Sequence, residues 1–357
     1  MPLFARYITR LFAARFALLL AGLTALVVLL DLMARGGDVV AGEGAGALWR
    51  YAGLRLPLIV SRLLPFSVLI AALLTLAGMA RHRELIVLIG AGVSQLRLML
   101  AFLPALAVIA AVHFWLDDRV APAAIAELRA WQAAGYGTGQ AAPGGTAVWL
   151  RQGNDVIRLK GAQATQANGG ERLAGVTIFR RDAEGILAER IDAASAALED
   201  GGWVLYDVAR FDVASNTVAT QARLVWDGDL RPSLAASLAA HPRELSFARV
   251  RALADAPGYG NRPLYLYQTW LNRKLVAPLA SLLMILFAVP LGQRFERQGG
   301  AATIAAGVAI GFCFFVFDGF TLAVGEAGLL PPWIAAWAPT LAFAAIGGAM
   351  AFHPERR

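Results

Sequence analysis

The stretch Leu56-Pro-Leu-Ile-Val-Ser-Arg-Leu-Leu-Pro-Phe-Ser-Val-Leu-Ile-Ala-Ala-Leu-Leu-Thr-Leu-Ala-Gly-Met79 decides the fold class of this chain. Its only formal charge is Arg62. The hydrocarbon core of a bilayer is crossed by about 20 mostly apolar residues in helical conformation, so this stretch predicts a membrane-spanning helix.

Five further stretches have the same character. The stretch nearest the N-terminus, Phe12–Met33, carries Arg15 near its start and Asp31 near its end. A cleaved signal peptide is the alternative to a membrane-spanning helix here. No clear small-x-small cleavage site follows it, so a retained helix is favoured. The stretches are Phe12–Met33, Leu98–Leu116, Leu275–Leu291, Ala301–Gly325 and Pro331–Phe352.

Composition agrees with a membrane protein. Of the 357 residues, 58% are hydrophobic and 16% are charged, whereas a soluble domain is about half apolar and a quarter charged. The net charge of +7 does not indicate nucleic-acid binding, because residues 117–262 carry 16 basic and 17 acidic groups and the excess lies in the apolar portion. The single cysteine, Cys313, excludes an intramolecular disulfide.

Basic residues predict the orientation of the chain. With six spans and an inside N-terminus, ten arginines fall on the cytoplasmic side and three, Arg35, Arg50 and Arg55, fall in short outer loops. Arg273 and Lys274 are exceptions that we expect to snorkel to the outer interface. The ten are Arg6, Arg10, Arg15, Arg81, Arg83, Arg97, Arg294, Arg297, Arg356 and Arg357. Both termini are therefore predicted to be cytoplasmic.

The segment between the third and fourth spans has the pattern of β structure. Short alternating runs are separated by turn residues such as Gly153-Asn154-Asp155, which is typical of a sandwich or jelly roll. We expect Leu116–Ala134 to continue the third helix outward and Ser246–Ala254 to be a helix. The predicted strands are Thr146–Leu150, Val156–Lys160, Val176–Arg180, Ile186–Ile191, Trp203–Val208 and Val218–Trp226.

The predicted organisation is thus a membrane α-helical fold, three helices and three, with an inserted all-β, jelly-roll-like domain. Residues 1–116 hold the first three helices, residues 117–262 form a periplasmic domain, and residues 263–357 hold the last three. We expect this protein in a bacterial inner membrane.

Enzyme signatures are missing. The chain has no Gly-x-x-x-x-Gly-Lys phosphate loop, no Gly-x-Ser-x-Gly elbow and no His-Glu-x-x-His pair. Transport driven by hydrolysis would therefore need a separate ATPase. An intramembrane enzyme using Asp31, Asp318 or His113 is a rival hypothesis, disfavoured because no paired catalytic residues stand at a suitable spacing. No metal site is predicted.

The loop after the second span is more informative. It reads Arg81-His-Arg-Glu-Leu-Ile-Val-Leu-Ile-Gly-Ala-Gly92, an apolar run in a loop that should face water. A short helix ending at Gly90 fits this pattern. It is either an interfacial helix lying on the bilayer or a coupling helix that inserts into a groove of a cytoplasmic partner.

Motifs along nearly the whole chain resemble those of one family, the lipopolysaccharide export permeases (LptF/LptG), and are most like its LptG subunit. Their order and spacing carry the resemblance. They are Arg83-Glu84-Leu-Ile-Val with Gly90-Ala-Gly92, Val120-Ala-Pro122, Gly175-Val-Thr-Ile-Phe179, Lys274-Leu-Val-Ala-Pro278, Gly307-x-x-x-Gly311-Phe-x-Phe-Phe-Val-Phe-Asp318, and Leu330-Pro-Pro332 with Trp337-x-Pro339.

The resemblance implies a subunit of an ATP-binding-cassette exporter. Its partners would be an LptF-type sister permease, an LptB-type ATPase dimer and an LptC-type periplasmic bridge, with lipopolysaccharide as substrate and ATP and magnesium bound by the ATPase alone. The residues implied to dock on the ATPase are Arg83, Glu84, Leu85, Leu88, Ile89, Gly90 and Gly92.

Charges and aromatic residues in the spans are candidates for a substrate cavity. Isolated charges in membrane helices cost about 2.5–3.5 kcal/mol, so they usually face a cavity or a partner. Interfacial snorkelling and core packing are the alternatives. In the LptG-type members of the family that this chain resembles, a lysine often stands at the position of Val28, so this chain departs from the family pattern in its first span. The candidates are Asp31, Arg35, Arg55, Arg62, Phe66, Phe317, Asp318 and Phe320.

We expect Asp318 to form an ion pair with an arginine within the bundle, such as Arg62. Gly307 and Gly311, four residues apart, predict close approach of another helix. By resemblance, that helix comes from the sister permease. A mechanotransmission permease is the remaining rival, but such proteins usually have four spans with the large domain after the first.

Overall fold

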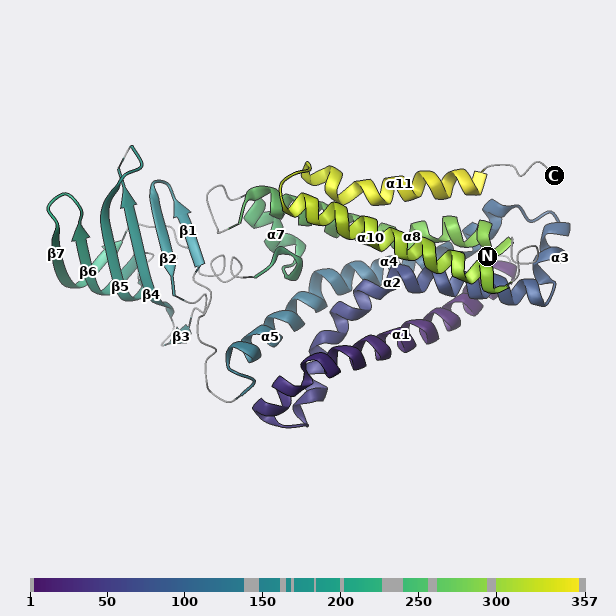
Figure 1. The fold of residues 1–357 in the computed structure, drawn as a ribbon, viewed down its shortest axis with the longest axis horizontal. Helices are drawn as coiled ribbons and strands as arrows, with labels where there is room; N and C mark the ends of the chain where they lie inside the picture. The colour runs from purple at the N-terminus through teal and green to yellow at the C-terminus, as the bar shows by residue number, and fades with distance from the viewer. Residues whose placement is uncertain are drawn as a thin grey trace. The chain divides into compact units, whose positions relative to one another are not determined.

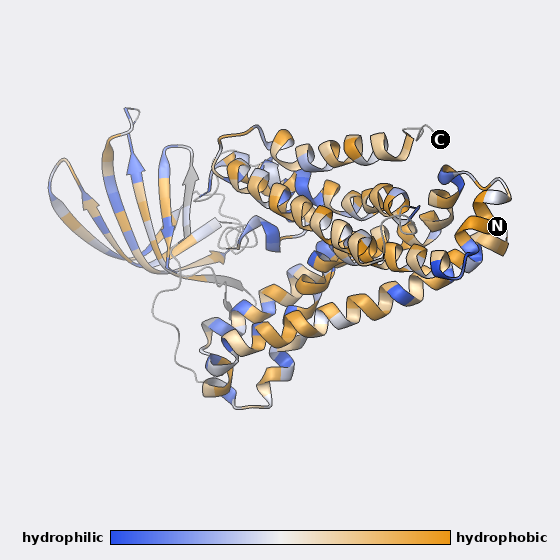
Figure 2. Ribbon diagram, turned by 45° about the vertical axis from the view of Figure 1, so that its right-hand side comes forward, coloured by the Kyte–Doolittle hydropathy of each residue, from blue (hydrophilic) through white to orange (hydrophobic). Residues whose placement is uncertain are grey.

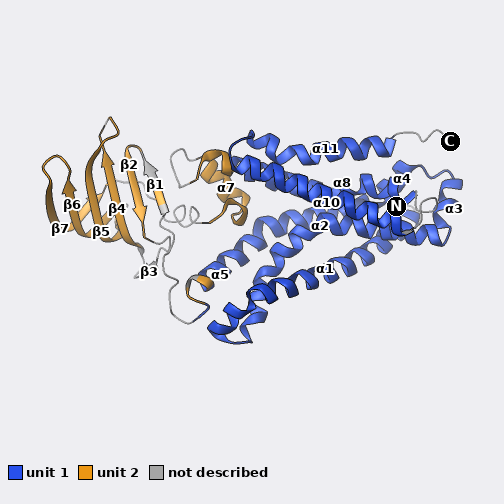
Figure 3. Ribbon diagram, in the orientation of Figure 1, with its two compact units in different colours: residues 1–131, 136–138, 268–357 blue, residues 132–135, 139–267 orange. Residues whose placement is uncertain are grey.

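A computed structural model describes residues 3–137, 148–160, 165–167, 170–182, 184–199, 202–226, 240–255, 262–293 and 300–352. The chain divides into two compact units (Figure 3). The first, a helical unit, comprises residues 1–131, 136–138 and 268–357, and the second, a β unit, comprises residues 132–135 and 139–267.

Six long apolar helices confirm the six predicted spans (Figure 1). Apolar residues run along each of them (Figure 2), as burial in lipid and against neighbouring helices requires. The N-terminus of α1 and the C-terminal end of α11 lie at the same end of the helical unit. The helices are α1 (Leu3–Glu43), α2 (Ala47–Arg81), α4 (Gln95–Trp115), α8 (Leu264–Gln293), α10 (Gly300–Glu326) and α11 (Pro332–Phe352).

Several helices are longer than the predicted spans. α1 has 41 residues, so at 1.5 Å per residue it is about 60 Å long, twice the thickness of a hydrocarbon core. The third span continues through a π-helical turn, η1 (Leu116–Val120), into α5 (Ala121–Ala133), as predicted. The predicted domain boundary at residue 117 therefore falls inside a continuous helix.

The extended ends of α1, α2 and α5 have a small core of their own. Tyr51 of α2 and Val39 of α1 are fully buried there, and Leu128 and Trp131 of α5 are nearly so. The three helices therefore stay packed together beyond the length that a bilayer explains.

α2 is the central helix of the bundle. Its most apolar 18-residue window is 78% buried, against 6% for α1 and 28% for α10. Val68, Leu69, Leu73 and Leu76 are completely or almost completely inaccessible. The mean hydropathy of α2, 2.2, lies within the range of 1.5 to 2.5 spanned by the six helices, so only the tertiary structure identifies it as the buried one.

The close helix contact predicted at Gly307 and Gly311 exists, but its partner is α2 of the same chain. A Cβ added at Gly307 would collide with Leu73, and one added at Gly311 would come within 2.9 Å of the Phe66 ring. The prediction that these glycines receive a helix of the sister permease is therefore wrong. Small residues allow α10 and α2 to approach closely inside the subunit.

The described strands form one antiparallel sheet in the order β1-β2-β4-β5-β6-β7, with β3 also paired to β4. Except for β2 and β3, consecutive strands pair with each other, and short turns such as Gly153-Asn154, with Gly153 at positive φ, connect them. The strands are β1 (Val148–Gln152), β2 (Asp155–Leu159), β3 (Thr165–Ala167), β4 (Gly170–Arg181), β5 (Leu187–Glu199), β6 (Gly202–Asp212) and β7 (Thr217–Trp226).

The inserted β domain is thus confirmed, and closure into a jelly roll stays a prediction. All six predicted strands have a counterpart, although the predicted start of the first, at Thr146, lies outside the described residues. The short β3 was not predicted, because three residues are too few to show a period. α7 (Phe247–Ala254), preceded by the 3-10 turn η2 (Pro242–Glu244), confirms the predicted helix, with Ser246 as N-cap.

Replacement of Gly307 by valine should destabilise the helical unit. The new side chain would overlap Leu73, and overpacking of a buried contact costs about 1–3 kcal/mol. Gly319→Val in the same helix is the matched control, because a Cβ at Gly319 meets nothing within 4 Å. Thermal unfolding of the purified variants is the measurement, and equal midpoints for the two would contradict the α2–α10 contact.

Candidate functional site

The predicted loop helix is present as α3 (Glu84–Gly90) at the end of the unit where both termini lie (Figure 1). Arg83 precedes it with φ 59° and Gly92 follows it with φ 81°, so the chain reverses sharply on both sides. The Tyr7 hydroxyl donates to the Glu84 carboxylate at 3.2 Å, which ties α3 to α1. An acidic group in the first turn also favours this helix electrostatically.

The predicted docking residues of α3 do not share one environment. Leu85 is only 3% exposed and packs in the main core, and Leu88 is partly buried against the same core. Val87, at 68% exposed, points outward together with Ile86 and Ile89. Of the predicted docking residues, Leu85 and Leu88 therefore anchor the helix, and the outward apolar surface is Ile86, Val87 and Ile89.

Three of the predicted cavity charges, Asp31, Arg35 and Arg55, lie in one cluster at the other end of α1 and α2, together with Tyr51, which was not predicted. Arg55 holds Asp31 with two hydrogen bonds, from Nε at 3.0 Å and Nη2 at 2.9 Å, and the Tyr51 hydroxyl donates to the same carboxylate at 3.0 Å. Arg35 lies 3.8 Å from Asp31 and is about half exposed. The cluster of Asp31, Arg35, Tyr51 and Arg55 keeps one net positive charge, with Arg35 as its accessible cation.

Asp318 pairs with a different arginine from the one expected. Its carboxylate accepts a hydrogen bond from Nη2 of Arg273 at 2.6 Å, and both side chains are largely buried. The suggested pairing with Arg62 is therefore wrong, and so is the expectation that Arg273 snorkels to the outer interface. Arg62 itself is exposed on α2.

Lys274 also points inward, contrary to the prediction. It is 4% exposed, and its Nζ donates to the Asp117 carbonyl oxygen at 3.0 Å and lies 3.7 Å from the Asp117 carboxylate. Ser61 of α2 donates to the same carboxylate at 3.2 Å. Asp117 belongs to the π-helical turn η1, and such turns are frequent at functional sites.

His113 lies in the same region of the bundle. It is 3% exposed, and its Nδ1 is 3.5 Å from the Ser281 hydroxyl of α8. Together these side chains form a buried polar layer that connects α2, α4, η1, α8 and α10 and that balances two cations with two carboxylates. Its members are Ser61, His113, Asp117, Arg273, Lys274, Ser281 and Asp318.

Sequence reasoning missed Asp117 and placed Lys274 outside. The sequence did contain a signal for this pair. Asp117 directly follows the third apolar span and Lys274 directly precedes the fourth, so both residues lie at the same end of the helical bundle. Among the described residues, no group of three or more His, Cys, Asp or Glu side chains could hold a metal ion.

The aromatic candidates do not share one environment. Phe66 packs against Phe315 of α10 with ring centroids 6.3 Å apart, Phe317 is half-buried, and Phe320 is exposed. Phe320 belongs instead to an outward stripe at four-residue spacing, Val308, Phe312, Val316 and Phe320. This α10 stripe is an apolar surface of one helix face.

These features define a class of protein: a multi-pass membrane permease, with three spans on each side of an inserted β domain and a short apolar helix at the end that holds both termini. The model of the family described as lipopolysaccharide export system permease LptF/LptG matches residues 6–352, and the chain belongs to this family. It is accordingly a multi-pass inner-membrane protein.

Two relatives illustrate the similarity. The chain is 24% identical to the lipopolysaccharide export system permease protein LptG of Escherichia coli strain K12 over 345 residues, which is 91% of this chain and 90% of the relative. It is 20% identical to the LptG protein of Haemophilus influenzae strain Rd over 285 residues, 78% of each chain.

Removal of the Lys274 charge should destabilise the bundle. Lys274→Met leaves the Asp117 carboxylate without its cation, and breaking a buried pair costs about 3–5 kcal/mol, less here because Asp117 keeps some exposure. Thermal unfolding of the purified protein measures the loss, and a second substitution, Asp117→Asn, should recover part of it. Arg119→Gln is the control, because Arg119 is 78% exposed. An unchanged midpoint for Lys274→Met would show that the pair contributes nothing.

Proposed function

We propose that this chain is the transmembrane permease subunit of an ATP-binding-cassette exporter that extracts lipopolysaccharide from the inner membrane. Membership of the LptF/LptG family supports the substrate class. The observation that carries the mechanism is α3, a helix with an exposed apolar face at the end of the bundle that holds both termini.

A separate cytoplasmic ATPase, an LptB-type dimer that binds ATP and magnesium, would supply the energy. Ile86, Val87 and Ile89 would enter a groove on that ATPase, as apolar helix faces do in helix-in-groove recognition. Leu85 in the core and the Tyr7–Glu84 hydrogen bond would pass the movement of α3 to α2 and α1. In this proposal the chain is non-catalytic and needs no cofactor of its own.

The proposed orientation places α3 and both termini in the cytoplasm. The excess of arginine at this end supports it, although Arg294, Arg297, Arg356 and Arg357 lie outside the described residues. With three spans before it, the β domain would then be periplasmic. Its sheet ends in β1 and β7, whose outer edges have no partner strand among the described strands and suit strand addition to an LptC-type bridge protein.

The sister permease, of LptF type, would complete the cavity. α1 is the least buried of the six helices, and α10 carries the outward stripe defined above. Exposed apolar helix faces of this kind suit contact with a further membrane subunit or with the acyl chains of a substrate. Arg35 is the accessible cation for a lipid phosphate, because Arg55 is engaged by Asp31.

Val87→Asp should prevent copurification of the ATPase without affecting membrane insertion. The charge would enter an apolar groove without a partner, while the core residues of α3 remain unchanged. Leu96→Asp is the matched control, since Leu96 is 50% exposed at the start of α4 and is not part of α3. A pulldown from membranes with both partners coexpressed measures the association, and full ATPase recovery with Val87→Asp would refute the docking.

Arg35→Ala should reduce the amount of lipopolysaccharide that copurifies with the exporter. One arginine near an anionic lipid surface contributes about 1 kcal/mol, so we expect a decrease of about fivefold. Arg119→Ala removes an arginine that is more exposed than Arg35 and lies outside the cluster, and it should change nothing. Quantification of bound lipid by mass spectrometry is the assay. Equal lipid in both variants would exclude Arg35 from substrate binding.

A further inference from the structure

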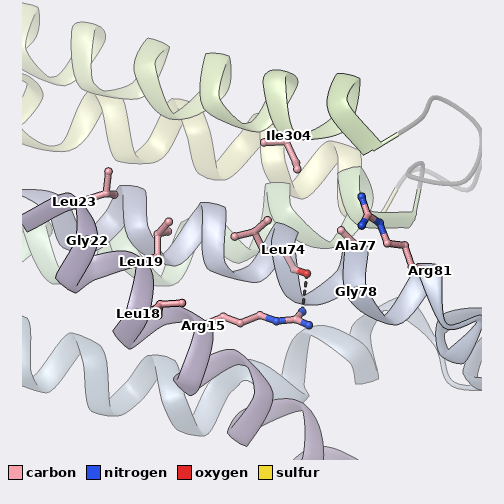
Figure 4. Close-up of a pocket in the computed structure, with 10 residues that line it drawn as sticks. All are labelled: Arg15, Leu18, Leu19, Gly22, Leu23, Leu74, Ala77, Gly78, Arg81 and Ile304. Carbon is pink, nitrogen blue, oxygen red and sulfur yellow. Dashed lines mark hydrogen bonds between the residues drawn. The ribbon is translucent and has the colours of Figure 1, made fainter. Parts of the chain in front are cut away.

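A cavity of about 570 Å³ lies between α1, α2 and α10, toward the end of the helices that carries α3 (Figure 4). Its size is typical of ligand pockets, about 300–1,000 Å³. Its walls are apolar except for two guanidinium groups. The lining residues are Arg15, Leu18, Leu19, Gly22, Leu23, Leu74, Ala77, Gly78, Arg81 and Ile304.

The two arginines of this cavity, half-buried Arg15 and exposed Arg81, differ from the cations of the two clusters described above. Arg15 donates from Nη1 to the backbone carbonyl oxygen of Leu74 at 2.6 Å (Figure 4), a neutral acceptor. Within the described part of the chain, neither Arg15 nor Arg81 forms an ion pair with a carboxylate, whereas Arg55, Arg273 and Lys274 each do. A mostly apolar cavity is therefore lined by two guanidinium groups that have no carboxylate partner among the described residues.

Two glycines, Gly22 and Gly78, line the cavity. A Cβ at Gly78 would lie 2.5 Å from Nη2 of Arg15, so only glycine lets the guanidinium lie directly on α2. At Gly22 a Cβ would meet nothing within 4 Å. Beside Gly22, Leu18 is 78% exposed, so the apolar wall along α1 is accessible from the surrounding bilayer.

We propose that this cavity binds an acidic phospholipid. The phosphate would lie between Arg15 and Arg81, because guanidinium groups form charge-assisted, bidentate hydrogen bonds with phosphate oxygens. One acyl chain would lie along Leu18, Leu19 and Leu23. If α3 is cytoplasmic, as proposed above, the lipid comes from the inner leaflet. Only this choice of leaflet rests on the proposed function.

The position of the site gives the lipid a structural role. Arg81 is the last residue of α2 and stands three residues before Glu84, the first residue of α3. A phospholipid in the cavity holds α1, α2 and α10 together at the base of α3. The site is separate from the cluster of Asp31 and Arg35, which lies at the opposite ends of α1 and α2.

Native mass spectrometry of the purified full-length chain, titrated with phosphatidylglycerol or phosphatidylcholine, tests the proposal. Arg81→Gln should weaken phosphatidylglycerol binding about fivefold and Arg15→Gln/Arg81→Gln at least about tenfold, while phosphatidylcholine binding changes little. Gly22→Leu fills the cavity and should remove both lipids. Arg10→Gln/Arg97→Gln is the charge-matched control, because both arginines are exposed at the same end and do not line the cavity.

Equal phosphatidylglycerol binding by the Arg15/Arg81 variant and its control would overturn the proposal, as would equal affinity of the wild type for the two lipids. Loss of the bound lipid when the sister permease and the ATPase are present would also overturn it, and would indicate that a helix of a partner fills the cavity. The measurement on the single chain needs neither ATPase nor lipopolysaccharide, so its failure is distinguishable from failure of the proposed function.

Discussion

A charge inside a membrane bundle needs a counter-charge, and in this protein the counter-charge comes from another helix. Asp117 of η1 holds Lys274 of α8, and Asp318 of α10 holds Arg273 of α8. No water is available in the hydrocarbon core to replace such a partner, so each pair fixes the rotation of two helices about their axes. The packing of α4, α8 and α10 around α2 depends on this buried polar layer.

The central position of α2 explains how a force on α3 would reach the other helices of the bundle. α1, α4 and α10 all contact it, and α3 follows it after two residues. Leu85 inserts α3 into the same core. A force applied to the exposed side of α3 therefore reaches the most buried helix directly, which is the physical basis of the proposed coupling to an ATPase. Because packed cores are bistable rather than continuously deformable, a small shift there is transmitted to the peripheral helices.

Three sites of the helical unit that contain basic side chains differ in net charge. The Asp31 cluster keeps one net positive charge and one accessible arginine, and the buried polar layer is neutral. The cavity with Arg15 and Arg81 keeps two charges without a carboxylate partner in the described part of the chain. An anionic lipid is thus expected at the first and third sites, whereas the second serves the architecture of the bundle.

The six spans, the inserted β strands, the short helix after α2 and the family could all be predicted from the sequence, because hydropathy, alternation and motif order are local properties of the chain. Tertiary structure decided which side chains meet. It paired Asp318 with Arg273 rather than Arg62, turned Lys274 inward, directed Leu85 and Leu88 to the core, and placed Gly307 against α2. The rotation of each helix is set by packing with helices distant in sequence, and hydropathy that is nearly uniform around a span carries no information about that rotation.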